Sequence, residues 1–145
     1  MKKSLVNKHK YFNNKWFARW AKIYYYEKYI MFPIRQKAVT FLKLNPPKNI
    51  IDIACGTGSQ AYELAKLGHN VVGIDLSPEM LNQAKRKLNN ELKLKFQQAD
   101  ATDLPFKDNS FDAATISFGL HDMPYEIELA TLKEAKRVVN PMEQS

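Results

Sequence analysis

Residues 50–60 read Ile50-Ile51-Asp52-Ile53-Ala54-Cys55-Gly56-Thr57-Gly58-Ser59-Gln60. An apolar run that carries a single acid leads into a Gly-x-Gly turn, and the pattern of an amphipathic helix follows at once. Glycine lets a backbone approach a ligand closely, and the N–H groups at a helix start are directed at anions. The stretch therefore predicts a strand, a ligand-binding turn and a helix.

Two further strand patterns end in acids. Residues 70–75 end in Asp75, and residues 94–98 are followed by Asp100. Because the carboxyl ends of parallel strands meet at one edge of a sheet, these acids and the turn predict a nucleotide-type pocket. The pattern G-x-G-x-x-A with an acid about twenty residues on also fits NAD, whereas the absence of G-x-x-x-x-G-K-[ST] excludes a P-loop. Asp52, inside its strand, favours a cationic ligand over a pyrophosphate.

Five segments in this order resemble the class I S-adenosylmethionine (SAM)-dependent methyltransferases, and among them the ubiquinone/menaquinone-biosynthesis group. The segments are residues 52–58, 73–81, 99–106, 110–114 and 132–141. The resemblance covers the chain from about Asn49 to Pro141 and implies SAM as the cofactor. It indicates methyl transfer to a small-molecule or lipid-like acceptor. RNA methylation and NAD-dependent chemistry are weaker alternatives.

The chemistry of SAM explains the residue types. Backbone N–H groups of the glycine turn suit its carboxylate, Asp52 suits its ammonium, and Asp75 offers enough acceptors for both ribose hydroxyls. The resemblance implies that Asp100 binds the adenine amino group and that Leu76 and Ala101 line the ring. Alternatively, Asp75 belongs to the N-terminal cap region of the next helix and Asp100 caps a local turn. The predicted cofactor-binding residues are Asp52, Ala54, Gly56, Gly58, Asp75, Leu76, Asp100, Ala101, Ser117 and Tyr24.

His121 follows the fourth predicted strand, where acceptor and methyl group are expected to meet. A histidine there can act as a base on the acceptor, or it can simply shape the pocket. Methyl transfer is an in-line displacement in which positioning does much of the work, so a base is optional. The histidines show no metal-binding spacing, so no metal is predicted, and His69 is expected at the surface.

The alternation of strand and helix patterns predicts an α/β fold: a Rossmann-like, doubly wound parallel sheet with helices on both faces. The family topology implies strand order 3-2-1-4. Predicted strands include residues 93–98 and 111–118. Predicted helices span residues 58–67, 77–89 and 126–139. The second helix is expected to bury Met80, Leu81, Ala84 and Leu88, and the third Ile127, Leu129, Ala130, Leu132, Ala135 and Val138.

The amino-terminal part differs in composition from the rest. Residues 1–48 carry twelve Lys and Arg against one acid and many aromatic residues, which gives a charge of +11 within a chain total of +7. Basic-aromatic segments suit anionic membrane surfaces, so peripheral membrane contact or a lipid-like acceptor is predicted, and nucleic acid less so. A solvated helix face is the alternative. We expect residues 1–48 to form a helical lid and residues 49–145 the partial SAM-binding domain.

The sequence ends four residues after Pro141, where the family pattern expects further strands. Strand 111–118 is therefore predicted to leave an apolar edge open to self-association. A truncated, cofactor-binding or inactive fragment without turnover is the alternative to an active methyltransferase. A single cysteine, no signal peptide and no run of eighteen apolar residues predict a cytoplasmic location.

Overall fold

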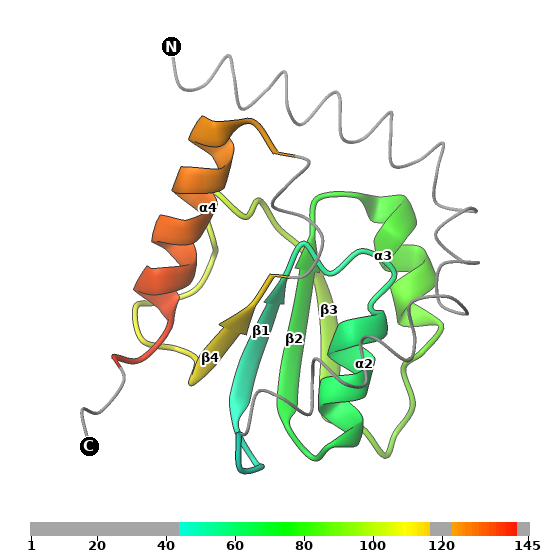
Figure 1. Ribbon diagram of the computed structural model, residues 1–145. Helices are drawn as coiled ribbons and strands as arrows, with labels where there is room; N and C mark the ends of the chain where they lie inside the picture. Colours follow the sequence, from blue (N-terminus) through cyan, green and yellow to red (C-terminus); the bar gives the residue numbers. More distant parts are fainter. Residues whose placement is uncertain (1–43, 117–122, 142–145) are drawn as a thin grey trace.

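The structure, a computed structural model, describes residues 44–116 and 123–141. Four parallel strands form one sheet in the order β3-β2-β1-β4, which confirms the predicted topology (Figure 1). The strands are β1 (Asn49–Ile53), β2 (Asn70–Asp75), β3 (Leu94–Gln98) and β4 (Ala113–Thr115). Within the described ranges, no helix is long and apolar enough to cross a membrane.

Helices cover both faces of the sheet. Helices α2 (Ser59–Lys66) and α3 (Pro78–Lys85) lie on one face, and α4 (Tyr125–Val138) lies on the other (Figure 1). The predicted doubly wound arrangement is therefore confirmed. The residues of 1–48 that carry the predicted helical lid lie, up to residue 43, outside the described part.

Two apolar clusters explain why the strands form a sheet interior. On the α2 side, Ile50 and Val71 pack with Leu64, and on the α4 side Ile51 and Ile74 join a separate buried cluster. Successive strand residues point to opposite faces, so the run Ile50-Ile51 contributes to both clusters. This explains why β1 reads as a continuous apolar run rather than as an alternation.

Helix α3 begins as the sequence predicts but ends early. Ser77 Oγ accepts a 3.3 Å hydrogen bond from the Met80 N–H, and Pro78 occupies the first helical turn. After Lys85 the chain tightens, because the Leu88 N–H bonds the carbonyl three residues back, at 3.2 Å. The expectation that Leu88 is buried is wrong, since its side chain is exposed.

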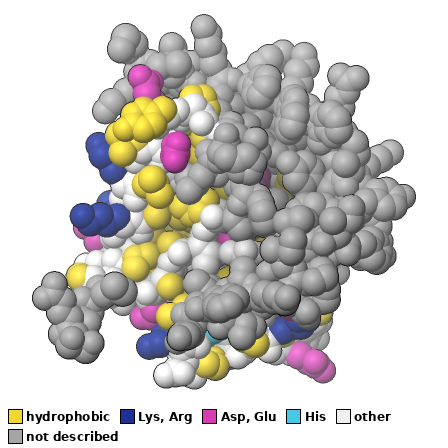
Figure 2. Space-filling view, viewed as in Figure 1, with side chains coloured by type: hydrophobic (Ala, Val, Ile, Leu, Met, Phe, Trp, Pro, Cys, Tyr) yellow, Lys and Arg dark blue, Asp and Glu magenta, His cyan; other side chains and the backbone are white. Residues whose placement is uncertain are grey.

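The inward face of α4 also differs from the prediction. Ile127, Thr131 and Val138 are buried, whereas Leu129 and Leu132 are 41% and 43% exposed. In a helix of 3.6 residues per turn these two leucines lie opposite the buried line. Leu129 and Leu132 therefore do not belong to the core, and Figure 2 shows hydrophobic side chains at the surface over α4.

Arg137, near the carboxyl end of α4, links this helix to the loop that precedes β4 by hydrogen bonds from its guanidinium. Arg137 Nε and Nη2 donate to the two carboxylate oxygens of Glu134 at 2.7 and 2.8 Å. The same guanidinium donates to the carbonyls of Phe106 and Leu104 and to Asp108 Oδ1. The hydrogen bonds that Arg137 donates to Glu134 lower the pKa of the Glu134 carboxyl group. The network fixes the crossover between β3 and β4 against the helix.

The outer side of β4 is partly covered. The strand is shorter than the predicted 111–118, and Phe111 instead forms a single parallel bridge with Val139. The Phe111 N–H donates to the Val138 carbonyl at 2.9 Å, and the Asn140 N–H donates to the Phe111 carbonyl at 2.8 Å. The chain after α4 thus begins to pair beside β4, a feature that the sequence did not predict.

His69 is a buried residue, and the expectation that it lies at the surface is wrong. Its side chain, 2% exposed, sits between α2 and β2, where Nδ1 accepts a 3.1 Å hydrogen bond from the Lys48 N–H. Burial lowers the pKa of His69 because it disfavours the charged imidazolium, and the Lys48 charge adds to that effect. The neutral imidazole therefore joins the start of β1 to the start of β2.

Candidate cofactor site

The carboxyl ends of the strands bring the predicted residues together. Ile53 of β1 pairs with Ile74 of β2, and Asp75 pairs with Gln98 of β3. The glycine loop (residues 54–58), Asp75 and Asp100 consequently follow strands that end at one edge of the sheet. This is the edge at which open α/β sheets bind ligands.

The glycine loop is a tight turn with three left-handed residues. Ala54, Gly56 and Gly58 have φ angles of 55°, 57° and 76°. The Cys55 N–H donates to the Ile74 carbonyl and the Gly58 N–H to the Cys55 carbonyl, both at 2.9 Å. These bonds fix the loop over the end of β2 before α2 begins at Ser59.

The two glycines of the loop have different surroundings. A Cβ on Gly56 would meet no atom of residues 44–116 and 123–141 within 4 Å, whereas one on Gly58 would lie 2.4 Å from the Phe96 ring and 2.9 Å from the Ala84 Cβ. Gly73 of β2 is also closed, since its Cβ would lie 2.7 Å from Phe96. Gly58 and Gly73 therefore make room for Phe96, and Gly56 is the glycine that borders open space.

Asp75 joins the loop to the start of α3. Its Oδ2 accepts a 2.8 Å hydrogen bond from the Gly56 N–H, and its Oδ1 accepts one of 2.9 Å from the Ser77 N–H. Burial raises the pKa of Asp75, and the bonds from backbone N–H groups oppose that rise. A carboxylate offers about four acceptor positions, so this one retains capacity for a ligand hydroxyl.

Asp52 is a buried acid inside β1. It pairs in register with Thr115 of β4, whose Oγ1 donates a 2.7 Å hydrogen bond to Asp52 Oδ1. Its charge and that of Asp75, after burial itself, raise the pKa of the neighbouring Cys55 thiol. Cys55 is therefore a neutral packing residue, as its place in the turn predicts.

The residues after β2 and β3 lie at the same edge of the sheet as the glycine loop. Asp100 Oδ1 accepts hydrogen bonds from the Thr102 N–H at 2.9 Å and from the Thr102 hydroxyl at 2.8 Å. Asp100 thus caps a local turn, one of the two roles that the sequence left open. The Leu76 carbonyl accepts a 3.0 Å hydrogen bond from Gln98 Nε2, and Ala101 packs against the α4-side apolar cluster.

Sequence reasoning missed three residues that shape this site. Lys87 Nζ donates a 2.7 Å hydrogen bond to the Thr57 carbonyl of the glycine loop, Phe96 packs under Gly58, and Thr115 holds Asp52. A glycine in the middle of a strand indicates close approach by another group, so Gly73 was an available signal for Phe96. No local pattern indicates Lys87 or Thr115, because both act across long sequence separations.

Three predicted residues lie outside the described part: Tyr24, Ser117 and His121. Their roles stay predictions. Among residues 44–116 and 123–141 no group of three His, Cys, Asp or Glu side chains is arranged to hold a metal ion.

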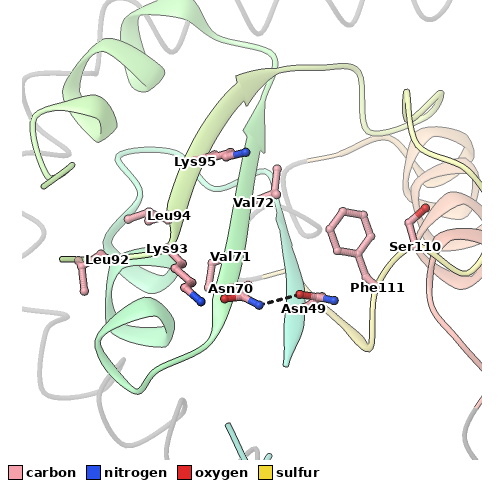
Figure 3. Close-up of a pocket in the computed structure, with 10 residues that line it drawn as sticks. All are labelled: Asn49, Asn70, Val71, Val72, Leu92, Lys93, Leu94, Lys95, Ser110 and Phe111. Atoms are coloured by element: carbon pink, nitrogen blue, oxygen red, sulfur yellow. Dashed lines mark hydrogen bonds between the residues drawn. The ribbon is translucent and has the colours of Figure 1, made fainter. Parts of the chain in front are cut away.

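A cavity of about 470 Å³ lies elsewhere, at the amino ends of the strands (Figure 3). Asn70 Nδ2 donates to Asn49 Oδ1 at 2.9 Å beside it, and Phe111 and Lys95 lie on its walls. None of the described residues that line it is a predicted site residue, and it lies at the opposite end of β1 and β2 from the glycine loop. The cavity is therefore separate from the candidate cofactor site.

Comparisons with known proteins agree with this geometry. Residues 50–142 match the methyltransferase domain family. The chain is 38% identical over 110 residues to a demethylmenaquinone methyltransferase of Staphylococcus saprophyticus, covering 74% of this chain and 46% of that protein. It is 48% identical over 107 residues to the ubiquinone/menaquinone biosynthesis C-methyltransferase UbiE of Rickettsia prowazekii, and this match covers 68% of this chain and 42% of that protein.

A solved structure supports the same assignment. A SAM-dependent methyltransferase from Methanosarcina mazei superposes with a TM-score of 0.63 at 30% identity, over 71% of this chain and 52% of that one. The chain belongs to the methyltransferase domain family, and its fold is that of the SAM-dependent, Rossmann-like methyltransferases. It spans less than half the length of the two curated relatives.

Proposed function

We propose that the carboxyl edge of the sheet binds SAM and that the protein transfers the methyl group of SAM to a small or lipid-like acceptor. The observation that carries the proposal is the hydrogen bond between the Gly56 N–H and Asp75, a half-buried acid. Among the described residues, Gly56 borders open space while its N–H is held by Asp75, which supports a shared role of the loop and this carboxylate in binding one ligand.

The chemistry of these residues fits the parts of SAM. The backbone of the glycine loop and the start of α2 suit the carboxylate, since helix N-termini favour anions. The remaining acceptor positions of Asp75 suit the ribose hydroxyls. The buried carboxyl group of Asp52 suits the positive end of the ligand. When bound, SAM supplies an electrophilic methyl group on a sulfonium.

The task left to the chain is mainly positioning. The loop, Asp75 and the turn at Asp100 hold the ligand in one orientation, which lowers the entropic part of the barrier for an in-line displacement. His121, four residues beyond Ser117, is our candidate for a base on the acceptor. An inactive, cofactor-binding fragment is the competing proposal for this chain.

We propose a quinone-type acceptor. One relative is named a demethylmenaquinone methyltransferase and the other a ubiquinone/menaquinone biosynthesis C-methyltransferase, and the chain is 38% and 48% identical to them. The basic-aromatic composition of residues 1–48 fits a lipid-like acceptor or contact with an anionic membrane. Co-sedimentation with anionic and with neutral vesicles tests that contact, and equal, negligible pelleting with both would contradict it.

Calorimetric titration of the purified chain with SAM, with its product S-adenosylhomocysteine and with NAD tests the cofactor. We expect binding of the first two and none of NAD. Binding of NAD alone would instead support a dehydrogenase. A transfer assay with methyl-labelled SAM and a short-chain demethylmenaquinone then tests the acceptor, and cofactor binding without turnover would support the inactive-fragment alternative.

A further inference from the structure

Lys87 reaches the glycine loop from the carboxyl-terminal side of α3. Its Nζ donates a 2.7 Å hydrogen bond to the carbonyl oxygen of Thr57, thirty residues earlier in the chain. Thr57 is buried and Lys87 is half-buried, so this contact is partly shielded from solvent. A charged donor makes a stronger hydrogen bond than a neutral one.

This hydrogen bond fixes the carbonyl side of the Thr57–Gly58 peptide group, and a second hydrogen bond fixes its N–H side. The Thr57 carbonyl and the Gly58 N–H belong to the same planar unit, and the Gly58 N–H donates to the Cys55 carbonyl at 2.9 Å. On the other side of Thr57, the Gly56 N–H is held by Asp75. Lys87 therefore completes a set of contacts that fixes the direction of the backbone around Thr57.

Packing supports the same conclusion. Ala84, one turn before Lys87, lies where a Cβ on Gly58 would approach to 2.9 Å, so α3 and the loop are in close contact. The Lys87 charge also acts to lower the pKa of Cys55, although burial has the larger, opposite effect. Lys85 in the last turn of α3 carries the same charge but is exposed.

We propose that Lys87 is a positioning residue for the methionine end of SAM. The proposal rests on the proposed function, because the glycine loop is where that carboxylate is expected. By fixing the Thr57–Gly58 peptide, Lys87 keeps the loop and the start of α2 in the conformation that receives this end of the ligand. The adenosine end is bound by other residues, Asp75 and those after β3, so Lys87 acts selectively on the amino-acid part.

Two ligands distinguish binding of the amino-acid part of SAM from binding of its adenosine part. S-adenosylhomocysteine carries adenosine and the amino-acid group, whereas methylthioadenosine lacks the amino-acid group. For Lys87→Met we expect roughly tenfold weaker binding of S-adenosylhomocysteine, the scale of one lost hydrogen bond to a charged group, and little change for methylthioadenosine. Lys87→Arg, which keeps a cationic donor, should restore part of the affinity. Lys85→Met is the control for a change of net charge.

The outcomes are distinct. Unchanged affinity of Lys87→Met for S-adenosylhomocysteine would overturn the proposal, as would an equal loss for both ligands in a variant that melts like the parent chain. A loss in Lys85→Met as large as in Lys87→Met would show a general charge effect and would also overturn it. If the parent chain binds neither ligand, the proposed function itself fails.

Discussion

The main-chain N–H of Gly56 donates a 2.8 Å hydrogen bond to Oδ2 of Asp75, which ties the turn after β1 to the last residue of β2. The two residues are nineteen positions apart, and the contact depends on the parallel pairing of β1 with β2. The same carboxylate holds the Ser77 N–H at the start of α3. The Asp75 side chain thus connects the glycine loop between β1 and α2 with the junction between β2 and α3, and both border the proposed ligand.

Replacement of Asp75 tests this connection. Asp75→Ala removes the acceptor of two N–H groups and the proposed ribose anchor, so we expect cofactor binding to weaken by about 1–3 kcal/mol. Asp75→Asn keeps the shape but replaces one acceptor oxygen by a donor, so its loss should be similar. Calorimetry with S-adenosylhomocysteine measures the effect, and binding of Asp75→Ala as tight as that of the parent chain would contradict the ribose assignment.

The two glycines of the loop should respond differently to alanine. Both have positive φ, which costs an L-residue about 1–2 kcal/mol. Gly58→Ala adds a clash with Phe96 and Ala84, so it should lower the melting temperature more than Gly56→Ala does. Gly56→Ala meets open space and should chiefly reduce cofactor binding.

Thermal melts and ligand titration of the two variants form a matched pair. Equal melting temperatures would argue against the close packing of Phe96 under Gly58. Unchanged ligand affinity in a folded Gly56→Ala variant would indicate that no ligand occupies the space beside that residue.

Much of this arrangement follows from local sequence patterns. The periodicities of residues 50–53 and 70–75, the Gly-x-Gly turn and the Ser77-Pro78 start of α3 predict elements that are confirmed to within a few residues. The strand order was implied by the family resemblance and is also confirmed. Local patterns suffice here because each signal depends on neighbouring residues.

The errors arise where tertiary contacts decide. Leu129 and Leu132 have the spacing of a buried helix face, yet Thr131 of α4 is buried instead, because the position of the helix over the sheet selects its inner line. His69 was expected at the surface because a turn usually lies there, but its acceptor nitrogen binds the Lys48 N–H. Lys87 acts over thirty residues, which no local pattern reveals.

Glu134 should make the stability of the folded chain depend on pH in the acidic range. Its pKa is lowered chiefly by the hydrogen bonds from Arg137, so its stabilising effect is present above the pKa of the unfolded chain, about 4.3, and is lost as the pH falls through the folded value. We expect Glu134→Gln to melt below the parent chain at neutral pH and the difference to shrink in acid. Melts from pH 7 to pH 3 measure this, and a constant difference would contradict the assignment.

Arg137→Lys is the companion variant. Lysine keeps the charge but cannot reproduce a planar fork that contacts Glu134, Asp108 and two carbonyls. It should therefore melt below the parent chain across the same range. A melting temperature equal to that of the parent would show that the charge alone suffices.

His69 should act in a higher pH range. Because burial lowers its pKa in the folded chain, the unfolded chain binds a proton more readily below about pH 6.5. Stability from His69 is therefore complete above that pH and declines as the pH falls toward the folded value. His69→Gln keeps an acceptor for the Lys48 N–H and does not titrate, so its melting temperature should change less between pH 7.5 and pH 5.5, a range set by that reference value.

The outer edge of β4 is the last feature to test, because within residues 44–116 and 123–141 it carries only the Phe111–Val139 bridge beyond its pairing with β1. The Phe111 N–H points outward to Val138 and the Asp112 N–H inward to Asn49, so by alternation the Ala113 N–H points outward. An open edge of this kind recruits another strand. We expect concentration-dependent self-association of the chain in sedimentation velocity.

Two variants distinguish this edge from the exposed leucines of α4. Ala113→Pro removes an outward donor while keeping the inward bonds, and proline is tolerated on edge strands, so it should reduce association. Replacing Leu129 and Leu132 together by serine should leave association unchanged if the edge is responsible. A monodisperse monomer at every concentration would contradict the expectation, and association lost only in the double serine variant would assign it to α4 instead.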